Sequence, residues 1–362
     1  MYVCFLSGCD GTFATGSSGT AGSAPDTATA IVMDTVFDIT VYGETPMASD
    51  LVDAGKELDE KVLSRYTDSV LRRYSQSDLS GQYGNDDSRA DRSENEVAIS
   101  GYSIDLKEII NRCDEINAVS DGAFDIRLGA LSDLWNIDSA AKEESDFIKP
   151  SEEEIIEVLD NKSVPDLGSV GKGVYLDLAY GILSDSKAKG AVISAGGSIL
   201  TYGEKPDGNA FRVGIKDPFN PLGSPYGILE LSGNHFISTS GGYERYIEVY
   251  GERYHHILNP LTGYPAWSRE DIRCRDTLGL GCDAEVSYSG DLLYPVSVTV
   301  IADNGLDSDA LSTACFVLGV DKGLELANKY NAEIIFILSD GSCIYSDGIL
   351  VTDNMNNVFK LI

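Results

Sequence analysis

The sequence predicts a mixed α+β fold with largely antiparallel sheets and packed helices. Apolar residues make up 43% of the 362 residues and charged residues 23%, a composition typical of a globular protein with a core. Several short segments between 190 and 258 alternate apolar and polar residues and follow one another without an intervening helical pattern. Because runs of consecutive strands are typical of α+β proteins, that class is favoured over a doubly wound parallel sheet.

Residues 1–30 differ in composition from the rest of the chain. The segment Leu6-Ser7-Gly8-Cys9 resembles the end of a bacterial lipoprotein signal, in which the cysteine becomes the lipidated first residue. The Gly/Ser/Thr/Ala-rich stretch after it is typical of a flexible tether. A basic segment and most of an apolar segment are missing before Cys9, so an ordinary tail is the alternative. We expect a tether over 1–30 and an extracytoplasmic protein anchored to a bacterial membrane through Cys9.

The first half of the remaining chain predicts one strand followed mainly by helices. Residues 31–42 alternate as a strand does, and residues 49–80 carry apolar residues at helical spacing. Residues 80–96 are polar and predict a loop. An amphipathic helix is expected over 104–120, ended by Asp121-Gly122.

Two further helices have clear starting signals. Within 138–164, an acidic helix is expected to begin after Pro150, because Ser151 and Glu154 have the spacing of a capping box. Residues 166–186 predict a glycine-containing loop that leads into a helix.

Strands dominate the second half, together with helices over 308–318 and 322–330. The expected strands are 190–203 with a glycine turn inside it, 211–216, 227–232, 235–240, a hairpin of 244–250 and 253–258, 295–302, 333–338 and 342–346. Since no linker interrupts the pattern after residue 31, we expect one domain over 31–362.

The charge of the chain limits its partners. Lys and Arg number 27 against 58 Asp and Glu, which gives a net charge of −31. So acidic a protein has no general attraction to nucleic acid or to an anionic membrane surface. An anionic ligand would need a local positive site, such as a helix N-terminus, a few basic side chains or a bound cation.

The cysteines do not indicate a zinc site, because the seven of them form no CxxC pair and no cluster with histidine. Cys274 and Cys282 lie in a glycine-rich segment and could form a disulfide in an oxidising compartment. No apolar run of about 18 residues, the length that spans a membrane, occurs in the chain.

Asp309 and Thr313 are the first candidates for chemistry. Their spacing places both oxygen-bearing side chains on one face of the helix expected over 308–318. A carboxylate beside a hydroxyl is suitable for Mg²⁺, which adds water and phosphate oxygens. The alternative is that both side chains cap free N–H groups in the first helical turn.

The segment Asp166–Gly173, DLGSVGKG, is the second candidate. Asp166 and Lys172 flank two glycines before a helix, where the backbone could approach a phosphate. A plain strand-to-helix turn with Lys172 on the surface is the alternative. No GxGxxG motif follows the first strand and no Walker loop is present, so a nucleotide site must be built in some other way.

Two more segments could contribute to a site. His255 and His256, two of the three histidines in the chain, fall on opposite faces of the expected strand, so one should face a cleft while the other packs. A histidine in a cleft could deprotonate or position a hydroxyl nucleophile. Residues 120–137 could seat an aromatic ligand at Gly122–Asp125, or form a turn and a core strand.

A longer series of motifs carries a family resemblance. In order along the chain come MDTVFDITVY, SDGAFDI, DLGSVGKGVYLD, ISAGGSILTYG, HHILNPLTGYPA and DSDALSTACFVLG. Over residues 31–362 this series closely resembles the ApbE-type FAD:protein FMN transferase family. The resemblance implies Mg²⁺-dependent cleavage of FAD, transfer of FMN to a Thr or Ser of an acceptor flavoprotein subunit of a membrane redox system, and release of AMP.

The resemblance also implies roles for particular residues. Asp309 and His256 would carry the catalysis, with His256 assisting attack by the acceptor hydroxyl. The implied magnesium ligands are Ser169, Asp309 and Thr313. The implied contacts to FAD are Met33, Tyr66, Ala123, Phe124, Asp125, Asp166, Lys172, Gly196, Gly197 and Ile257.

The chain departs from the family pattern at 267–293, which separates TGYPA from the next strand and is expected to be an insertion. It would either shape the docking of the acceptor or form a neutral surface loop. Two other functions use the same residues: an FAD pyrophosphatase, in which water replaces the protein hydroxyl, and a non-catalytic FAD-binding lipoprotein.

Overall fold

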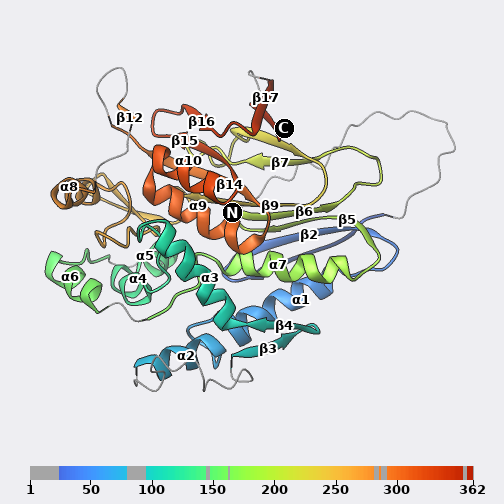
Figure 1. The fold of residues 1–362 in the computed structure, drawn as a ribbon, viewed down its shortest axis with the longest axis horizontal. Coiled ribbons are helices and arrows are strands. Elements are labelled where there is room, and N and C mark those ends of the chain that lie inside the picture. The colour runs from blue at the N-terminus through green and yellow to red at the C-terminus, as the bar shows by residue number, and fades with distance from the viewer. Residues whose placement is uncertain are drawn as a thin grey trace.

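The computed structural model confirms the predicted α+β fold (Figure 1). It describes residues 24–79, 95–143, 147–161, 164–280, 285–286, 292–353 and 357–361. Cys9 and Cys282 lie outside the described residues, as does most of the loop expected over 80–96. Among the described helices, none has both the length and the apolar character needed to cross a membrane.

Strands and helices alternate in groups along the chain. The strands are β1 (Asp26–Val32), β2 (Thr35–Gly43), β3 (Glu96–Ile99), β4 (Tyr102–Asp105), β5 (Ala188–Ala195), β6 (Ser198–Gly203), β7 (Phe211–Ile215), β8 (Gly227–Leu231), β9 (His235–Gly241), β10 (Tyr246–Val249), β11 (Glu252–His255), β12 (Glu285–Val286), β13 (Leu292–Leu293), β14 (Pro295–Ala302), β15 (Glu333–Leu338), β16 (Cys343–Tyr345), β17 (Ile349–Asp353) and β18 (Val358–Leu361). The helices are α1 (Ala48–Leu58), α2 (Val70–Leu79), α3 (Leu106–Val119), α4 (Gly129–Trp135), α5 (Ile137–Glu143), α6 (Glu152–Asp160), α7 (Gly171–Ser184), α8 (Arg269–Leu278), α9 (Gly305–Leu318) and α10 (Val320–Lys329).

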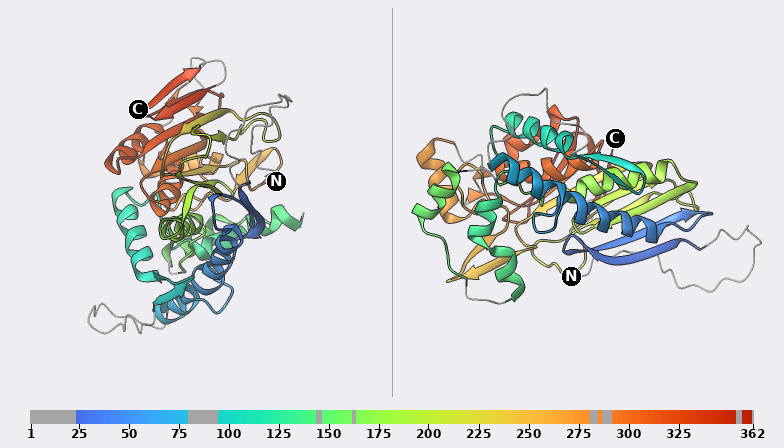
Figure 2. Two further views of the ribbon diagram at one scale, coloured as in Figure 1. Left: turned by 90° about the vertical axis from the view of Figure 1, so that its right-hand side faces the viewer. Right: turned by 90° about the horizontal axis from the view of Figure 1, so that it is seen from below.

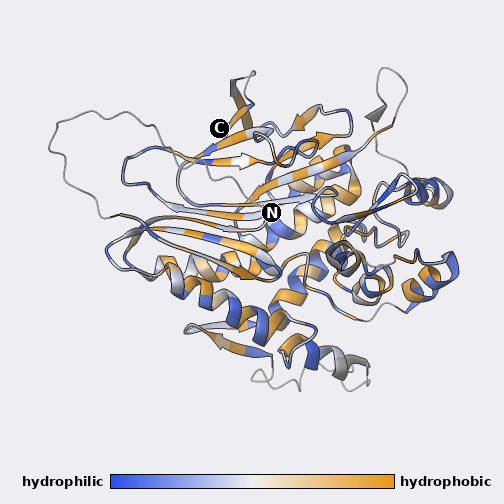
Figure 3. Ribbon diagram, turned by 180° about the vertical axis from the view of Figure 1, so that it is seen from behind, coloured by the Kyte–Doolittle hydropathy of each residue, from blue (hydrophilic) through white to orange (hydrophobic). Residues whose placement is uncertain are grey.

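A large antiparallel sheet forms the centre of the molecule. Its strand order is β1-β2-β5-β6-β9-β14-β15-β16. Phe37, Ile39 and Val41 alternate along β2 and are buried, so one side of the strand faces the core. Figure 3 shows hydrophobic residues concentrated along these strands and on the sides of the neighbouring helices.

Helices cover one face of this sheet, and a smaller sheet covers part of the other (Figures 1 and 2). Helices α1, α7, α9 and α10 pack on the first face and share one hydrophobic core with it. The smaller sheet has the order β17-β18-β8-β7. Its Leu229 and Phe359 pack with Ile301 and Ile337 of the large sheet in a second core. The burial of apolar side chains on both faces stabilises this layered arrangement.

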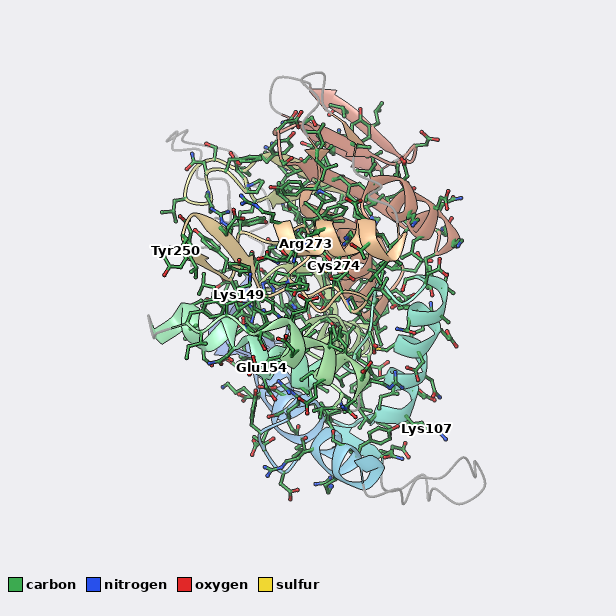
Figure 4. The ribbon with its side chains drawn as sticks, turned by 90° about the vertical axis from the view of Figure 1, so that its left-hand side faces the viewer. Lys107, Lys149, Glu154, Tyr250, Arg273 and Cys274 are labelled. Carbon is green, nitrogen blue, oxygen red and sulfur yellow. The ribbon has the colours of Figure 1, made fainter. Side chains whose placement is uncertain are left out.

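A third hydrophobic cluster lies at one end of the molecule. It joins α4, α5 and α6 to the β10–β11 hairpin, and we call these elements the outer wall. Trp135 stacks on Tyr254 with ring centroids 5.7 Å apart and donates its indole N–H to the carbonyl of Gly263 at 2.8 Å. Figure 4 shows Lys149 close to the hairpin that carries Tyr250 and to the helix that carries Glu154. Lys149 bonds the Tyr254 hydroxyl at 3.2 Å, which ties α6 to the hairpin.

The prediction of one strand over 31–42, after a tether ending at residue 30, is wrong. The chain forms a hairpin of β1 and β2, and residues 26–30 belong to its first strand. Met33 and Asp34 form the turn with φ of 51° and 57°. A two-residue turn with positive φ at both positions suits the twist of a hairpin.

The helix predicted over 49–80 is interrupted. Helix α1 continues as a π-helical segment, Asp59–Leu63, and the chain becomes extended at Ser64. The buried Ser69 hydroxyl accepts the N–H of Arg72 at 3.0 Å, at the start of α2. The break places Tyr66 outside both helices, where its side chain is 75% exposed.

Other short elements were also missed by the sequence pattern. Residues 129–135 form helix α4, and no strand follows the turn at 121–122 as one alternative required. The β3–β4 hairpin precedes α3, and β17 and β18 follow the strands expected to close the chain. The capping box of Ser151 and Glu154 at the start of α6 is confirmed, as is the hairpin at 246–255.

Candidate active site

A cavity of about 270 Å³ separates the outer wall from the ends of α7 and α9. The outer wall contributes residues of α4 and α5, and the opposite side contributes the loop before α7, the end of β9 and one face of α9. Residues far apart in sequence therefore meet around one space. The cavity brings together most of the residues singled out in the sequence.

The inner end of the cavity is formed where α7 crosses α9, at Lys172, Gly173, Gly305, Asp309 and Thr313. The two glycines allow this approach, because a Cβ at Gly173 would lie 2.2 Å from the carbonyl oxygen of Gly305. A Cβ at Gly305 would likewise lie 2.2 Å from the carbonyl oxygen of Gly173. Any side chain at either position would push the helices apart.

Each of the two helices caps the other. Asp309 of α9 accepts the N–H of Gly173 at 2.9 Å, and Asp177 of α7 accepts the N–H groups of Gly305 and Leu306 at 2.6 and 2.9 Å. Burial raises the pKa of Asp177 to about 6, although these two N–H groups oppose the increase. The mutual caps satisfy free backbone N–H groups and fix Asp309 relative to the start of α7.

The proposal that Asp309 and Thr313 merely cap the first turn of their helix is wrong. Helix α9 begins at Gly305, and Asn304 is its cap through a 2.8 Å bond from the N–H of Asp307. Asp309 therefore does not cap its own helix, and it lines the cavity, where it is only 4% exposed.

The contacts of Asp309 and Thr313 converge at the inner end. One carboxylate oxygen of Asp309 lies 3.5 Å from the ammonium of Lys172, and the other accepts the Ser198 hydroxyl at 3.2 Å. The Thr313 hydroxyl lies 3.1 Å from that of Ser240. Ser169 lines the same cavity from the loop before α7.

This donor set fits Mg²⁺ better than a softer metal. One carboxylate and two hydroxyls are hard oxygen donors that leave positions for water and phosphate. Within the described ranges, no group of three or more His, Cys, Asp or Glu side chains could hold a metal ion. Six acidic side chains and three basic ones line the cavity, so a diphosphate would require an added cation. The acidic ones are Asp125, Asp133, Asp138, Asp166, Glu244 and Asp309, and the basic ones are Arg65, Lys172 and Arg245.

The two adjacent histidines have different surroundings, as the alternation predicted. His255 is buried edge-on against Phe316, and its Nε2 donates to the carbonyl of Ala266 at 2.8 Å. Burial lowers the pKa of His255 to about 4, so the ring is neutral at pH 7. This side chain holds the loop in place and does not line the cavity.

His256 lines the cavity and has a defined tautomer. Its Nδ1 lies 3.2 Å from the carbonyl oxygen of Arg245, which can only accept a proton, so Nδ1 carries the hydrogen. Nε2 is then left as an acceptor. Burial, and then the nearby Arg245 and His255, lower the pKa of His256 well below its ordinary value. The ring is therefore a neutral base at pH 7.

Most of the predicted FAD contacts line the cavity. The structure brings Ala123, Phe124 and Asp125 there on a loop, held by the Asn117 amide that donates to the Phe124 carbonyl at 2.6 Å. Also lining the cavity are Tyr66, Asp166, Lys172, Gly197 and Ile257. Two predicted contacts are not brought to the cavity: Met33 lies in the β1–β2 turn, and Gly196 lines a neighbouring groove.

Several charged residues of the cavity were not singled out in the sequence. Arg65 binds Asp133 with two contacts of 3.0 and 3.2 Å and lies 3.3 Å from Asp166. Arg245 binds one oxygen of Asp138 at 2.8 Å, while the other oxygen is buried without a partner among the described residues. No local pattern marks these residues, since each pair is distant in sequence. Only the position of Arg65 beside Tyr66 could have drawn attention to it.

Part of the expected insertion at 267–293 supports the site. Asp271 of α8 is fully buried and accepts bonds from Asn259, Thr262, the N–H of Trp267 and Arg275 at 2.6 to 2.8 Å. These bonds hold the loop that follows His256, so this part is not a neutral surface loop. Figure 4 shows Arg273 and Cys274 on the same helix, and Cys274 is a free thiol in the structure.

A comparison with protein families gives a clear match. The model of the ApbE family matches residues 33–271 and 293–337, most of the chain. The segment between these ranges, 272–292, falls within the expected insertion.

Curated proteins give a consistent result. The FAD:protein FMN transferase of Treponema pallidum is 30% identical over 260 residues, which cover 64% of this chain and 65% of that protein. The enzyme of the same name from Klebsiella pneumoniae is 30% identical over 257 residues, 66% and 71% of the two chains. That of Salmonella typhimurium is 26% identical over 352 residues, 88% of each.

Solved structures have the same fold. The ApbE protein of Thermotoga maritima matches with a TM-score of 0.66 and 27% identity over 89% of this chain and 97% of that one. The apo flavinyl transferase ApbE of Pseudomonas stutzeri matches with a TM-score of 0.64 and 23% identity, over 91% and 96% of the two chains. At 23% identity, the match to the Pseudomonas stutzeri protein supports the fold alone.

Proposed function

The chain belongs to the ApbE family, and we propose that it transfers FMN from FAD to a Thr or Ser hydroxyl of an acceptor protein, with Mg²⁺ as the cofactor. As an enzyme it is an FAD:protein FMN transferase, like its curated relatives. The observation that carries the mechanism is that Asp309, Thr313, Ser169, Lys172 and His256 line one cavity, although they come from distant parts of the chain.

Asp309, Thr313 and Ser169 would hold Mg²⁺ at the inner end. When bound there, the ion would neutralise the diphosphate of FAD in a cavity whose own side chains are mainly acidic. Lys172, at the start of α7, would add a second positive contact from the protein.

The opposite side of the cavity would bind the rest of FAD. Tyr66 would offer its exposed ring, while Phe124 and Ile257 line the cavity but are almost completely buried. The unpartnered oxygen of Asp138 would accept a hydrogen bond from a hydroxyl or amino group of the substrate. These contacts orient FAD so that its phosphates reach the inner end.

His256 would act as the base of the transfer. The acceptor oxygen bonds to the phosphorus of the FMN half, while the bond from that phosphorus to the bridging oxygen breaks. AMP leaves with the bridging oxygen, and the hydroxyl proton passes to Nε2 of His256. The bond of Nδ1 to the Arg245 carbonyl keeps Nε2 available for this proton.

The acceptor and the location of the protein are further parts of the proposal. The acceptor would be a flavin-carrying subunit of a membrane redox system, and the protein would be held outside the cytoplasm by a lipid on Cys9. The Leu6–Cys9 motif and the Gly/Ser-rich stretch after it support this location. Mass spectrometry of the protein from its native cells, with Cys9→Ala as control, would show whether the lipid is attached.

The activity is tested by incubating the protein with FAD, Mg²⁺ and a Thr-containing acceptor, while AMP and protein-bound flavin fluorescence are measured. We expect both products, and we expect a chelator to remove both. Release of AMP and FMN without bound flavin would identify a pyrophosphatase instead. If FAD binds but no AMP forms with any divalent cation, the protein is a binding protein.

A further inference from the structure

A second hollow, which we call the side groove, adjoins the cavity at the Gly196–Gly197 turn. It has a volume of about 150 Å³. Its walls come from the start of β2, this turn, the loop between β7 and β8, and the residues after β9. The roles discussed above involve its walls only at the glycine turn, through the expected FAD contacts of Gly196 and Gly197.

The side groove is continuous with the catalytic cavity, because Gly197, Thr239 and Glu244 line both. Ser198, next to Gly197, donates to the Asp309 carboxylate at 3.2 Å. Ser240, next to Thr239, lies 3.1 Å from the Thr313 hydroxyl. Ser240 and Thr239 face opposite sides of β9, since the Thr239 hydroxyl bonds Thr299, so it is the shared residues that place one end of the groove at the wall of the cavity lined by Asp309 and Thr313.

The same end of the groove adjoins the base. Glu244 lines both hollows and is followed by Arg245, whose carbonyl oxygen lies 3.2 Å from Nδ1 of His256. A hydroxyl that entered along the groove would thus reach the cavity that Asp309, Thr313 and His256 line. This is the position that the second substrate of a transferase must reach.

The walls of the groove do not suit a phosphate. They are mainly apolar and include Pro221, Pro225 and Leu222, whose side chain is 90% exposed. Lys216 is paired with Glu244 at 3.7 Å, so its charge is already partly neutralised. Apolar walls of this kind favour an apolar segment over an anionic group, whose burial without partners is costly.

The groove also lies along a sheet edge. In the described part of the chain, β7 is the last strand of the smaller sheet, and its Gly214 lines the groove. Edge strands can pair with an extended segment of another chain.

We propose that the side groove binds an extended, largely apolar segment of the acceptor protein and leads its Thr or Ser hydroxyl to the inner end of the cavity. This inference rests on the proposed transferase function. It assigns the loop between β7 and β8 to recognition of the acceptor, and the cavity to FAD.

The test uses Leu222→Glu, because an exposed side chain can be changed without disturbing the core. Leu278→Glu, at the end of α8 and 58% exposed, is the matched control. Binding of fluorescent peptides with a central Thr between apolar residues is measured by anisotropy. FAD affinity, AMP release without a peptide, and flavin transfer to the peptides are measured on the same proteins.

We expect Leu222→Glu to weaken peptide binding and to lower kcat/KM for transfer about tenfold or more, while FAD affinity and AMP release stay as in wild type. Leu278→Glu should match wild type throughout. The inference is overturned if wild type binds none of the peptides, if Leu222→Glu binds them equally well, or if the variant loses FAD affinity. Peptide binding that depends on Leu222 without any flavin transfer would support the groove and contradict the proposed function.

Discussion

The inner end of the cavity and the outer wall are built in different ways. At the inner end, two helices approach through glycines, with a backbone oxygen only 2.2 Å from where a side chain would begin, and each helix caps the other through a carboxylate. The outer wall is held by aromatic stacking around Trp135 and by partly exposed ion pairs such as Arg245–Asp138.

This difference separates two tasks of one site. The side chains that would hold Mg²⁺ must keep a fixed geometry, because coordination and in-line transfer tolerate little displacement. Close backbone packing gives that geometry. The outer wall must bind and release a large substrate, and side-chain contacts of modest strength allow it to adjust. Substitutions should therefore have larger effects at the inner end.

The largest effect is expected from Asp309→Ala. Loss of the carboxylate should lower the rate of AMP release from FAD about a thousandfold, because the remaining hydroxyls hold Mg²⁺ poorly. Asp309→Asn keeps an acceptor for the Gly173 N–H and so separates the metal role from helix packing. Asp321→Ala, an exposed acid in the first turn of α10, is the control. A variant with more than about a tenth of the wild-type rate would remove Asp309 from the metal site.

His256 lies between the two regions, and His256→Gln should slow transfer about a hundredfold with little change in FAD affinity. Since burial lowers its pKa well below about 6.5, wild type should keep its rate as the pH falls through that value. The rate should then fall at lower pH, when the ring becomes protonated and can no longer act as a base. The measurement is kcat against pH. A rate that increases on acidification would contradict this role.

Gly173→Ala tests the helix crossing directly. The added methyl group would meet the Gly305 carbonyl, so we expect the free energy of unfolding to fall by about 2 kcal/mol. We also expect AMP release to need a higher Mg²⁺ concentration, because the residues that would hold the ion are displaced. Gly171→Ala on the same helix is the matched control, because its methyl group would meet only a Leu63 methyl at 3.2 Å. Urea unfolding measures the free energies. Equal losses in the two variants would show that the crossing is not unusually tight.

The smallest effect is expected in the outer wall, from Lys149→Met. Lys149 contacts Glu270 and the Tyr254 hydroxyl, and its side chain is 36% exposed. The loss of unfolding free energy should stay below about 1 kcal/mol, with AMP release nearly unchanged. Should this change reduce catalysis as much as one at the inner end, the contrast between the two regions would be wrong.

Local patterns predicted the regular elements well where a periodicity or a cap marks them. The capping box at Ser151 and the strands β9 and β14 were confirmed, although β14 is buried along nearly its whole length and not on one face alone. The β1–β2 hairpin was missed, because Met33 and Asp34 form its turn without the Asn-Gly or Gly-Gly signal that marks such turns. The break around Tyr66 was missed as well, since the helical spacing continues through it.

The sequence by itself determined the chemistry available to this protein. It placed a carboxylate and a hydroxyl on one helix face at Asp309 and Thr313, two adjacent histidines that were expected to have different surroundings, and a series of motifs that indicated the family. These features are local, so spacing along the chain is sufficient to read them.

Only the tertiary structure decided which groups meet. Asp309 and Gly173 are 136 positions apart and Arg112 bonds Asp307 across 195 positions, yet both contacts fix the start of α9. The structure also distinguished the buried His255 from the His256 that lines the cavity, and placed the side groove beside the inner end. Such contacts arise from the packing of whole helices and sheets, which no short stretch of sequence specifies alone.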